Sequence, residues 1–262
     1  MQRSLAASVS VFRVRLLALG SAAFLAAGLG QAASAQNYET LFKTCFASTL
    51  PDRVIASCSA VIGRRLAEGE DLATAFKNRG NAHDDMGEHA QALDDYGQAL
   101  AINPQDADAF NSRGTTYMAL GQHDRAVGDF DQAIALNPAS PMASGNRCYA
   151  RALLGQLETA LADCDTALRL KPGNPAARAA RAFVHLRARR PDAAITDYDA
   201  VLRARSDDAP ALFGRGLARA LKGDRAGADI DLAAARARQP DIEDEMARLG
   251  LRLQDFLRMK PG

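Results

Sequence analysis

The sequence has little of what metal-binding and nucleic-acid-binding proteins display. Its 262 residues carry 32 basic and 31 acidic side chains, so the formal net charge is only +1. This balance argues against general nucleic-acid binding, which depends on a marked basic excess. Histidine is scarce, and the four histidines lack the spacing of metal ligands: His83, His89, His123 and His185. The sequence therefore predicts no metal site and no nucleic-acid partner.

Motifs for catalysis are also missing. No glycine-rich loop suited to cradling phosphate is present, and no serine lies near a base in a recognisable motif. Adjacent acids such as Asp84 and Asp85 would point apart on a helix instead of converging on a substrate. We therefore expect a protein that is not an enzyme and that needs no cofactor.

An apolar stretch near the amino terminus is short for a membrane span. Residues 16–29 are uncharged, follow Arg3, Arg13 and Arg15, and precede the sequence Ala-Ser-Ala that ends at Ala35. This pattern predicts a secretory signal peptide over residues 1–35. A retained signal anchor is the alternative, but the run is shorter than a typical membrane-spanning helix. We therefore expect an exported, periplasmic protein whose mature chain has no membrane span.

A repeat of 34 residues begins at Ala73 and recurs five times without a gap. Its units are residues 73–106, 107–140, 141–174, 175–208 and 209–242. Within each unit the apolar and small residues have helical spacing twice. Two columns hold only small residues: Gly80, Gly114, Cys148, Ala182 and Gly216 in one, and Ala92, Ala126, Ala160, Ala194 and Ala228 in the other. The sequence thus predicts an all-α fold of helical hairpins.

The second unit carries the most complete motif of the five. It reads Phe110, Gly114, Tyr117, Gly121, Ala126, Phe130, Ala133 and Pro138. This pattern resembles the tetratricopeptide repeat over residues 73–242, and the resemblance implies a right-handed α-solenoid. Residues 36–72 are then predicted to form a degenerate helical hairpin that caps the amino-terminal end. Residues 243–262 are predicted to form a capping helix and a tail.

A column of arginines departs from the family pattern, which usually has leucine there. Each arginine is followed sixteen residues later by an aspartate on the second predicted helix of its unit. Because a semi-buried charge is costly unless it is paired, we predict a ladder of ion pairs along the stack. The alternative is that the arginines bind an anionic ligand. The pairs are Arg79 with Asp95, Arg113 with Asp129, Arg147 with Asp163, Arg181 with Asp197, and Arg215 with Asp231.

The four cysteines are even in number, and export favours their pairing as disulfides. Cys148 occupies the small column of a first helix, and Cys164 occupies the aromatic column of the second helix that should face it. We therefore predict a bridge between them. Cys45 and Cys58 flank a turn at Pro51 and would close a similar hairpin. A redox-active pair is the alternative, but neither spacing is Cys-x-x-Cys.

The family resemblance also implies where a partner would bind. In tetratricopeptide arrays the first helices line a concave groove, and peptides or helices of partner proteins dock there. The implied groove residues change from polar to apolar: Lys77, Asn78, Asn81, Asp84, Asp85, Asn111 and Thr115, then Tyr149, Leu153, Phe183, Leu186, Phe213, Leu217 and Leu221. A carboxylate clamp is not predicted, because most of its positions lack the expected residues. The apolar part would either contact a partner or be covered by the tail that contains Phe256 and Leu257.

Charge is distributed unevenly along the repeats. Residues 36–140 carry 8 basic and 15 acidic side chains, a net charge of −7, whereas residues 141–240 carry 17 and 11, a net charge of +6. Solvated arginine-rich helix faces alone would also give this distribution. We interpret the chain as a periplasmic adaptor or scaffold that binds a peptide or helix of another protein. The alternatives are a self-assembling structural protein that forms homo-oligomers and a non-catalytic regulatory subunit of an envelope enzyme.

Overall fold

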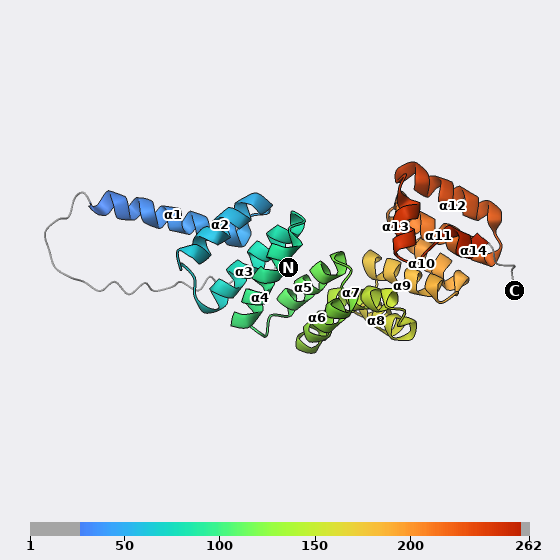
Figure 1. Ribbon diagram of the computed structural model, residues 1–262, viewed down its shortest axis with the longest axis horizontal. Helices are drawn as coiled ribbons and strands as arrows, with labels where there is room; N and C mark the ends of the chain where they lie inside the picture. The colour runs from blue at the N-terminus through green and yellow to red at the C-terminus, as the bar shows by residue number, and fades with distance from the viewer. Residues whose placement is uncertain (1–26, 258–262) are drawn as a thin grey trace, which may run out of the picture. The chain divides into compact units, whose positions relative to one another are not determined.

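The computed structural model describes residues 27–257, which form helices and no strand (Figure 1). Contacts between residues divide the chain into two units after Thr40, and residues 27–40 of the first unit belong to the first helix. The helices are α1 (Ala27–Ala47), α2 (Pro51–Gly63), α3 (Gly69–Asp85), α4 (His89–Ile102), α5 (Ala107–Ala119), α6 (His123–Leu136), α7 (Pro141–Leu153), α8 (Leu157–Leu170), α9 (Pro175–Arg187), α10 (Pro191–Ala204), α11 (Ala209–Lys222), α12 (Arg225–Arg238), α13 (Ile242–Arg248) and α14 (Leu253–Leu257). The predicted all-α fold is confirmed.

Each 34-residue unit is one helical hairpin, from α3 with α4 to α11 with α12. Each second helix packs against the first helix of the next unit, as α4 does against α5 and α10 against α11. The first helices α3, α5, α7, α9 and α11 also contact one another in sequence. The hairpins therefore stack as an α-solenoid in which every unit contacts its neighbours.

Side-chain caps fix where the first helices begin. Asp106, Ser140, Asn174 and Asp208 each accept a hydrogen bond from a backbone N–H in the first turn of the helix that follows. Such a cap satisfies a donor that the helix itself leaves unpaired, and it contributes about 1 kcal/mol. Because the caps recur at the period of the repeat, the same local signal starts α5, α7, α9 and α11.

The small-residue column allows the two helices of a hairpin to approach closely. A Cβ atom added to Gly114 would lie 2.6 Å from Cε1 of Phe130, and one added to Gly216 would lie 2.9 Å from Cγ of Leu232. A methyl group has no room at these separations. Phe130 is fully buried as a result, and burying such a ring contributes roughly 2 to 3 kcal/mol.

The turns inside the hairpins require left-handed backbone. Gly223 ends α11 with φ of 91°, and glycine provides this conformation in three of the other units. Arg189 takes the same place after α9, with φ of 57°. Its guanidinium lies 4.8 Å from the ring centre of Phe256, which belongs to α14. The turn of the fourth hairpin thus holds a side chain that contacts the C-terminal segment.

The amino-terminal hairpin of residues 41–63 is held to α3 by a small apolar cluster. Cys45, Val54, Cys58 and Val61 are buried together with Ala75 and Ala82 of α3. Most of the predicted signal peptide, residues 1–26, lies outside the described residues. None of the described helices is long and apolar enough to cross a membrane.

The C-terminal segment differs from the single capping helix that the sequence predicts. It forms two short helices, α13 and α14, joined at Gly250, which has φ of 80°. Both pack against α11, and Figure 1 shows them beside it. Their apolar side chains belong to one cluster with the last first helices: Ile242, Met246, Leu251 and Phe256 with Phe183, Phe213 and Leu217. The segment folds back because a final hairpin without a following unit leaves its apolar face exposed to water.

Candidate partner-binding groove

The face formed by the first helices contains a large apolar hollow, here called the main hollow. Its volume is about 720 Å³. It lies between α7, α9, the start of α11 and the C-terminal helix α13. Its apolar lining includes Met142, Tyr149, Ala176, Ala180, Phe183, Met246 and Leu249, and its polar and charged lining includes Asn146, Lys171, Asn174, Tyr198, Arg205, Asp208 and Glu245.

A second hollow, of about 350 Å³, continues the same face toward α5 and α6. Asn146, Tyr149 and Leu249 line both hollows. The rest of its lining is mainly apolar and includes Met118, Phe130 and Leu153. An apolar surface therefore runs along the first-helix face from α5 to α11.

Three of the residues predicted to line the groove are buried instead. Leu186, Phe213 and Leu217 each have 0% of their surface exposed. They pack in the core cluster that contains the side chains of α13 and α14. The expectation that they line an open groove is wrong, because the C-terminal segment covers the last first helices. Of the two possibilities for the apolar part, self-coverage holds at Phe213 and Leu217.

Three of the other four apolar candidates lie on the hollows. Tyr149 and Phe183 line the main hollow, with their rings in edge contact at 5.4 Å between centres. Leu153 lines the second hollow, and Leu221 is half-buried against the core. Thus the structure divides the predicted apolar stretch into an open part on α7 and α9 and a covered part on α11.

The early, polar candidates are mostly engaged within the fold. Lys77 forms an ion pair of 2.7 Å with Asp106, and Asn78 donates a hydrogen bond of 3.1 Å to the carbonyl oxygen of Cys45. Asn111 is only 6% exposed and accepts a hydrogen bond from Asn146. Asn78 and Asn81 also line a hollow of about 150 Å³ next to Cys45. The early groove therefore offers a smaller and more polar surface than the late one.

Two tyrosines in the same repeat column differ in what their hydroxyl groups contact. Tyr96 donates a hydrogen bond of 2.7 Å to Oδ1 of Asn81. At the place of Asn81, the unit of Tyr198 has Phe183, which has no acceptor atom. Tyr198 is 3% exposed, and its hydroxyl group has no hydrogen-bond partner within residues 37–256. Burial raises the pKa of both phenols, so each remains a neutral O–H donor.

The arginine column lies beside the aspartate column in every unit. Arg113 donates from Nε and Nη2 to the two carboxylate oxygens of Asp129, both at 2.7 Å. The same two-pronged contact joins the other four pairs at 2.5 to 2.9 Å. The hydrogen bonds to Asp197 and Asp231 raise the pKa of Arg181 and Arg215. These arginines therefore form bidentate ion pairs with carboxylates of their own hairpins.

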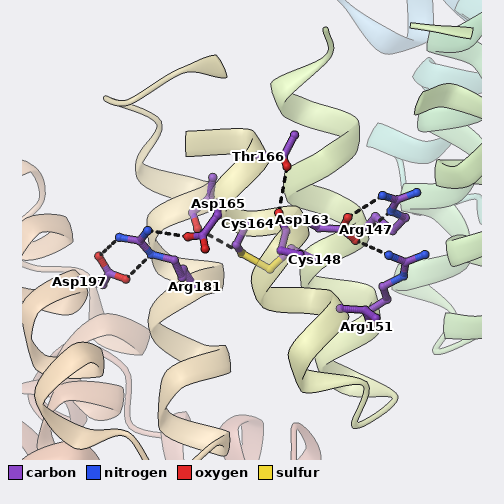
Figure 2. The surroundings of a disulfide bond; sticks show 12 residues. Arg147, Cys148, Arg151, Asp163, Cys164, Asp165, Thr166, Arg181 and Asp197 are labelled. Carbon is purple, nitrogen blue, oxygen red and sulfur yellow. Dashed lines mark hydrogen bonds and ion pairs between the residues drawn. A yellow bond between two sulfur atoms is a disulfide. The ribbon is translucent and has the colours of Figure 1, made fainter. Parts of the chain in front are cut away.

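A second set of aspartates, absent from the sequence-based ladder, links neighbouring hairpins. Nη1 of Arg147 lies 2.7 Å from Asp131. Nη1 of Arg181 lies 2.8 Å from Asp165, as Figure 2 shows. Arg215 contacts Asp199 in the same way at 2.7 Å. The sequence contains the pattern that predicts these contacts, since each of these acids precedes its arginine by sixteen residues and the pairs recur with the repeat. Each such arginine joins two hairpins and helps to set the angle between them.

Both predicted disulfides are confirmed. Cys148 of α7 is bonded to Cys164 of α8 (Figure 2), and Cys45 is bonded to Cys58. All four cysteines are at most 2% exposed. Closing a loop of about this length stabilises a fold by on the order of 3 kcal/mol, mainly through the unfolded chain. Their burial favours a structural role over exchange with other thiols.

The described histidines do not assemble into a site. His83 and His89 contact Glu88 and Asp84 at 2.6 and 2.7 Å. His123 and His185 each have a buried Nδ1 atom without a hydrogen-bond partner. Across the described residues, no group of three His, Cys, Asp or Glu side chains could hold a metal ion.

Repeated helical hairpins with small-residue columns and a groove face define the class of protein as an α-solenoid. A family model of the tetratricopeptide repeat matches residues 73–106, and a second one matches residues 111–175 and 178–242. Because these matches cover more than half of the sequence, the chain belongs to the tetratricopeptide repeat family. No curated protein sequence matches it.

Solved structures show the same fold. A tetratricopeptide repeat protein from Parabacteroides merdae has a TM-score of 0.64 at 18% identity, over 85% of this chain and 98% of its own. YrrB, described as having an unusual peptide-binding site, has a TM-score of 0.55 at 22% identity, over 74% and 98%. MamA has a TM-score of 0.54 at 21% identity, over 68% and 96%. Identities this low show similarity of fold alone.

Proposed function

We propose that this chain is a non-catalytic adaptor that binds a segment of another protein on its first-helix face. The fold supports a role in protein–protein interaction, and one observation carries the proposal further. The two hollows form a continuous apolar surface that the chain itself leaves open, although it covers the equivalent surface of α11. Exposed apolar surfaces of this kind mark interaction sites.

We also propose that the adaptor works in the periplasm after removal of residues 1–35. Two buried disulfides support an oxidising compartment. Mass spectrometry of the protein from the periplasmic fraction should find a chain that starts at Gln36 and contains both bridges. A reduced chain that keeps residues 1–35 would contradict this location.

Site-specific photo-crosslinking in the producing cell tests the proposed binding face. A photoreactive amino acid is placed at the exposed positions Asn81 and Met142 on first helices, and at Gln132 and Ile230 on second helices as controls. We expect a discrete cross-linked species from Met142 and none from Ile230. Mass spectrometry of that species then shows whether the cross-linked partner is a different protein or a second copy of this chain.

Equal cross-linking from both faces would show that the groove is not the binding surface. A cross-linked product that contains only this chain would instead support self-assembly, and size measured at several salt concentrations would then test the part played by charge.

A further inference from the structure

We infer that the main hollow takes a particular kind of segment: a short peptide with apolar side chains, a hydrogen-bond acceptor above Tyr198 and a carboxylate beside Lys171. This inference rests on the proposed function and specifies the chemistry of the partner. Three features of the hollow carry it: an unused hydrogen-bond donor, a lysine without an ion pair, and an apolar wall that the chain's own helix already contacts.

The unused donor is the hydroxyl group of Tyr198. Its ring lies against α11 at a position where only glycine fits, since a Cβ atom added to Gly214 would lie 2.4 Å from the hydroxyl oxygen. The tyrosine is 97% shielded from water and lines the hollow, yet its hydroxyl has no partner in the described part of the chain. The hydroxyl oxygen is therefore accessible from the hollow and can donate a hydrogen bond there. A ligand with a carbonyl or carboxylate oxygen at this point would accept that hydrogen bond.

The lysine without an ion pair is Lys171. Four charged residues line the hollow. Arg205 forms an ion pair with Asp208, whereas Glu245, on α13, has no ion pair among the described residues and accepts a hydrogen bond of 2.6 Å from the neutral side chain of Gln239. Lys171 is exposed and has no ion pair among the residues that the structure describes. The net charge of +6 over residues 141–240 also favours a negatively charged ligand. The complementary group on the ligand is therefore a carboxylate.

The third feature is the apolar wall of the hollow. Met142, which is 54% exposed, lines the hollow together with Phe183 of α9. Met246 of the chain's own α13 and Leu249, which directly follows it, also line the hollow, and the first turn of α13 contains three acids, Glu243, Asp244 and Glu245. A short helix that carries both acidic and apolar side chains thus already packs at the hollow. We take its chemistry as the pattern for the partner, and the continuation into the second hollow favours a chain over a single fatty acid.

Selection from a displayed library of random short peptides tests the inference. The immobilised full chain, with both disulfides formed, is the bait. We expect the enriched peptides to combine apolar residues with Asp or Glu. Lys171→Glu and Met142→Glu should each weaken binding of an enriched peptide by about tenfold or more, because each places a negative charge at the hollow. Tyr198→Phe should weaken binding about threefold to tenfold, as expected for loss of one hydrogen bond.

Ile230→Glu provides the matched control, since Ile230 is an exposed apolar residue on α12 and 69% of its surface is accessible. This variant should bind enriched peptides as the unchanged chain does. Enrichment of basic peptides, no enrichment, unchanged binding to Met142→Glu, or displacement of the peptides by a long-chain fatty acid would overturn the inference. Cross-links to a partner from Met142 would still support the proposed function in those cases, whereas their absence would contradict the proposed function itself.

Discussion

Tyr96 and Tyr198 occupy the same column of the repeat, yet only Tyr96 has its hydroxyl group paired within the fold. The early hairpin supplies Asn81 as the acceptor, whereas the fourth hairpin has Phe183 there. The ring of each tyrosine serves the core in the same way, since both are at least 97% buried. The comparison shows that the conserved spacing of the repeat maintains the stack, while the variable columns decide what its surface offers to a ligand.

The two ends of the groove differ in a second way. On α5 and α7 the first-helix face is open and leads into the hollows, whereas on α11 it is covered by Ile242, Met246 and Phe256. Apolar residues on the late first helices therefore serve two purposes. Those near Tyr149 remain available, and those near Phe213 hold the C-terminal segment.

The largest expected effect concerns the ion pairs. Asp231→Ala should lower the free energy of unfolding by about 3 to 5 kcal/mol, because it removes the buried carboxylate that two arginines contact. Asp231 is 2% exposed and accepts hydrogen bonds from both Arg215 and Arg219. Asp129→Ala, which affects Arg113 alone, should cost less. Urea denaturation measures both, with exposed Asp229→Ala as the control. Equal losses from Asp231→Ala and Asp229→Ala would contradict a stabilising role for the ladder.

The second prediction concerns the packing of α13 and α14 on α11. Met246→Ala should lower the free energy of unfolding by about 3 kcal/mol, since Met246 is 3% exposed in the cluster with Phe213. Met118→Ala, on the open early part of the groove, should cost clearly less because Met118 is only half-buried. Urea denaturation again gives the values, and hydrogen exchange should show faster exchange in α13 and α14 for the Met246 variant. A loss no larger than that of Met118→Ala would mean that the segment contributes little.

Substitution of Tyr96 and of Tyr198 by phenylalanine should change stability by a smaller amount, and by a different amount at the two positions. Tyr96→Phe removes a hydrogen bond and should cost about 1 kcal/mol of stability. Tyr198→Phe removes a hydroxyl group that has no partner in the described chain, so stability should stay within about 0.5 kcal/mol or rise. Thermal unfolding of the two variants side by side measures the difference. If Tyr198→Phe were the more damaging change, the hydroxyl group of Tyr198 would have a partner inside the fold.

The smallest effect depends on pH. Burial lowers the pKa of His185, whose Nδ1 atom has no partner within the described residues. The unfolded chain then binds a proton more readily, so the contribution of His185 is complete above about pH 6.5 and is lost as the pH falls. His185→Gln should flatten this part of the stability profile. An unchanged slope in His185→Gln would assign the effect to other groups.

Much of the fold could be predicted from the sequence because it depends on the repeat. Residues sixteen apart face each other in every hairpin, so the pairing of Arg113 with Asp129 and the bridge between Cys148 and Cys164 both follow from the columns. The contacts of Arg147 with Asp131 and of Arg181 with Asp165 follow from the same spacing, although the ladder considered only one acid for each arginine. The candidate groove was predicted less well, because a first helix has an open face only where nothing else covers it.

By itself, the sequence determined the helical hairpins, their order and the contacts that recur with the repeat, because each unit packs on the next in the same way. Only the tertiary structure decided that α13 and α14 fold back onto α11, that Phe213 and Leu217 are buried, and that the hydroxyl group of Tyr198 faces an open hollow without a partner. These features join a segment outside the repeat to residues far away in the chain. No period relates such contacts to one another, since they follow from how the whole stack buries its remaining apolar surface.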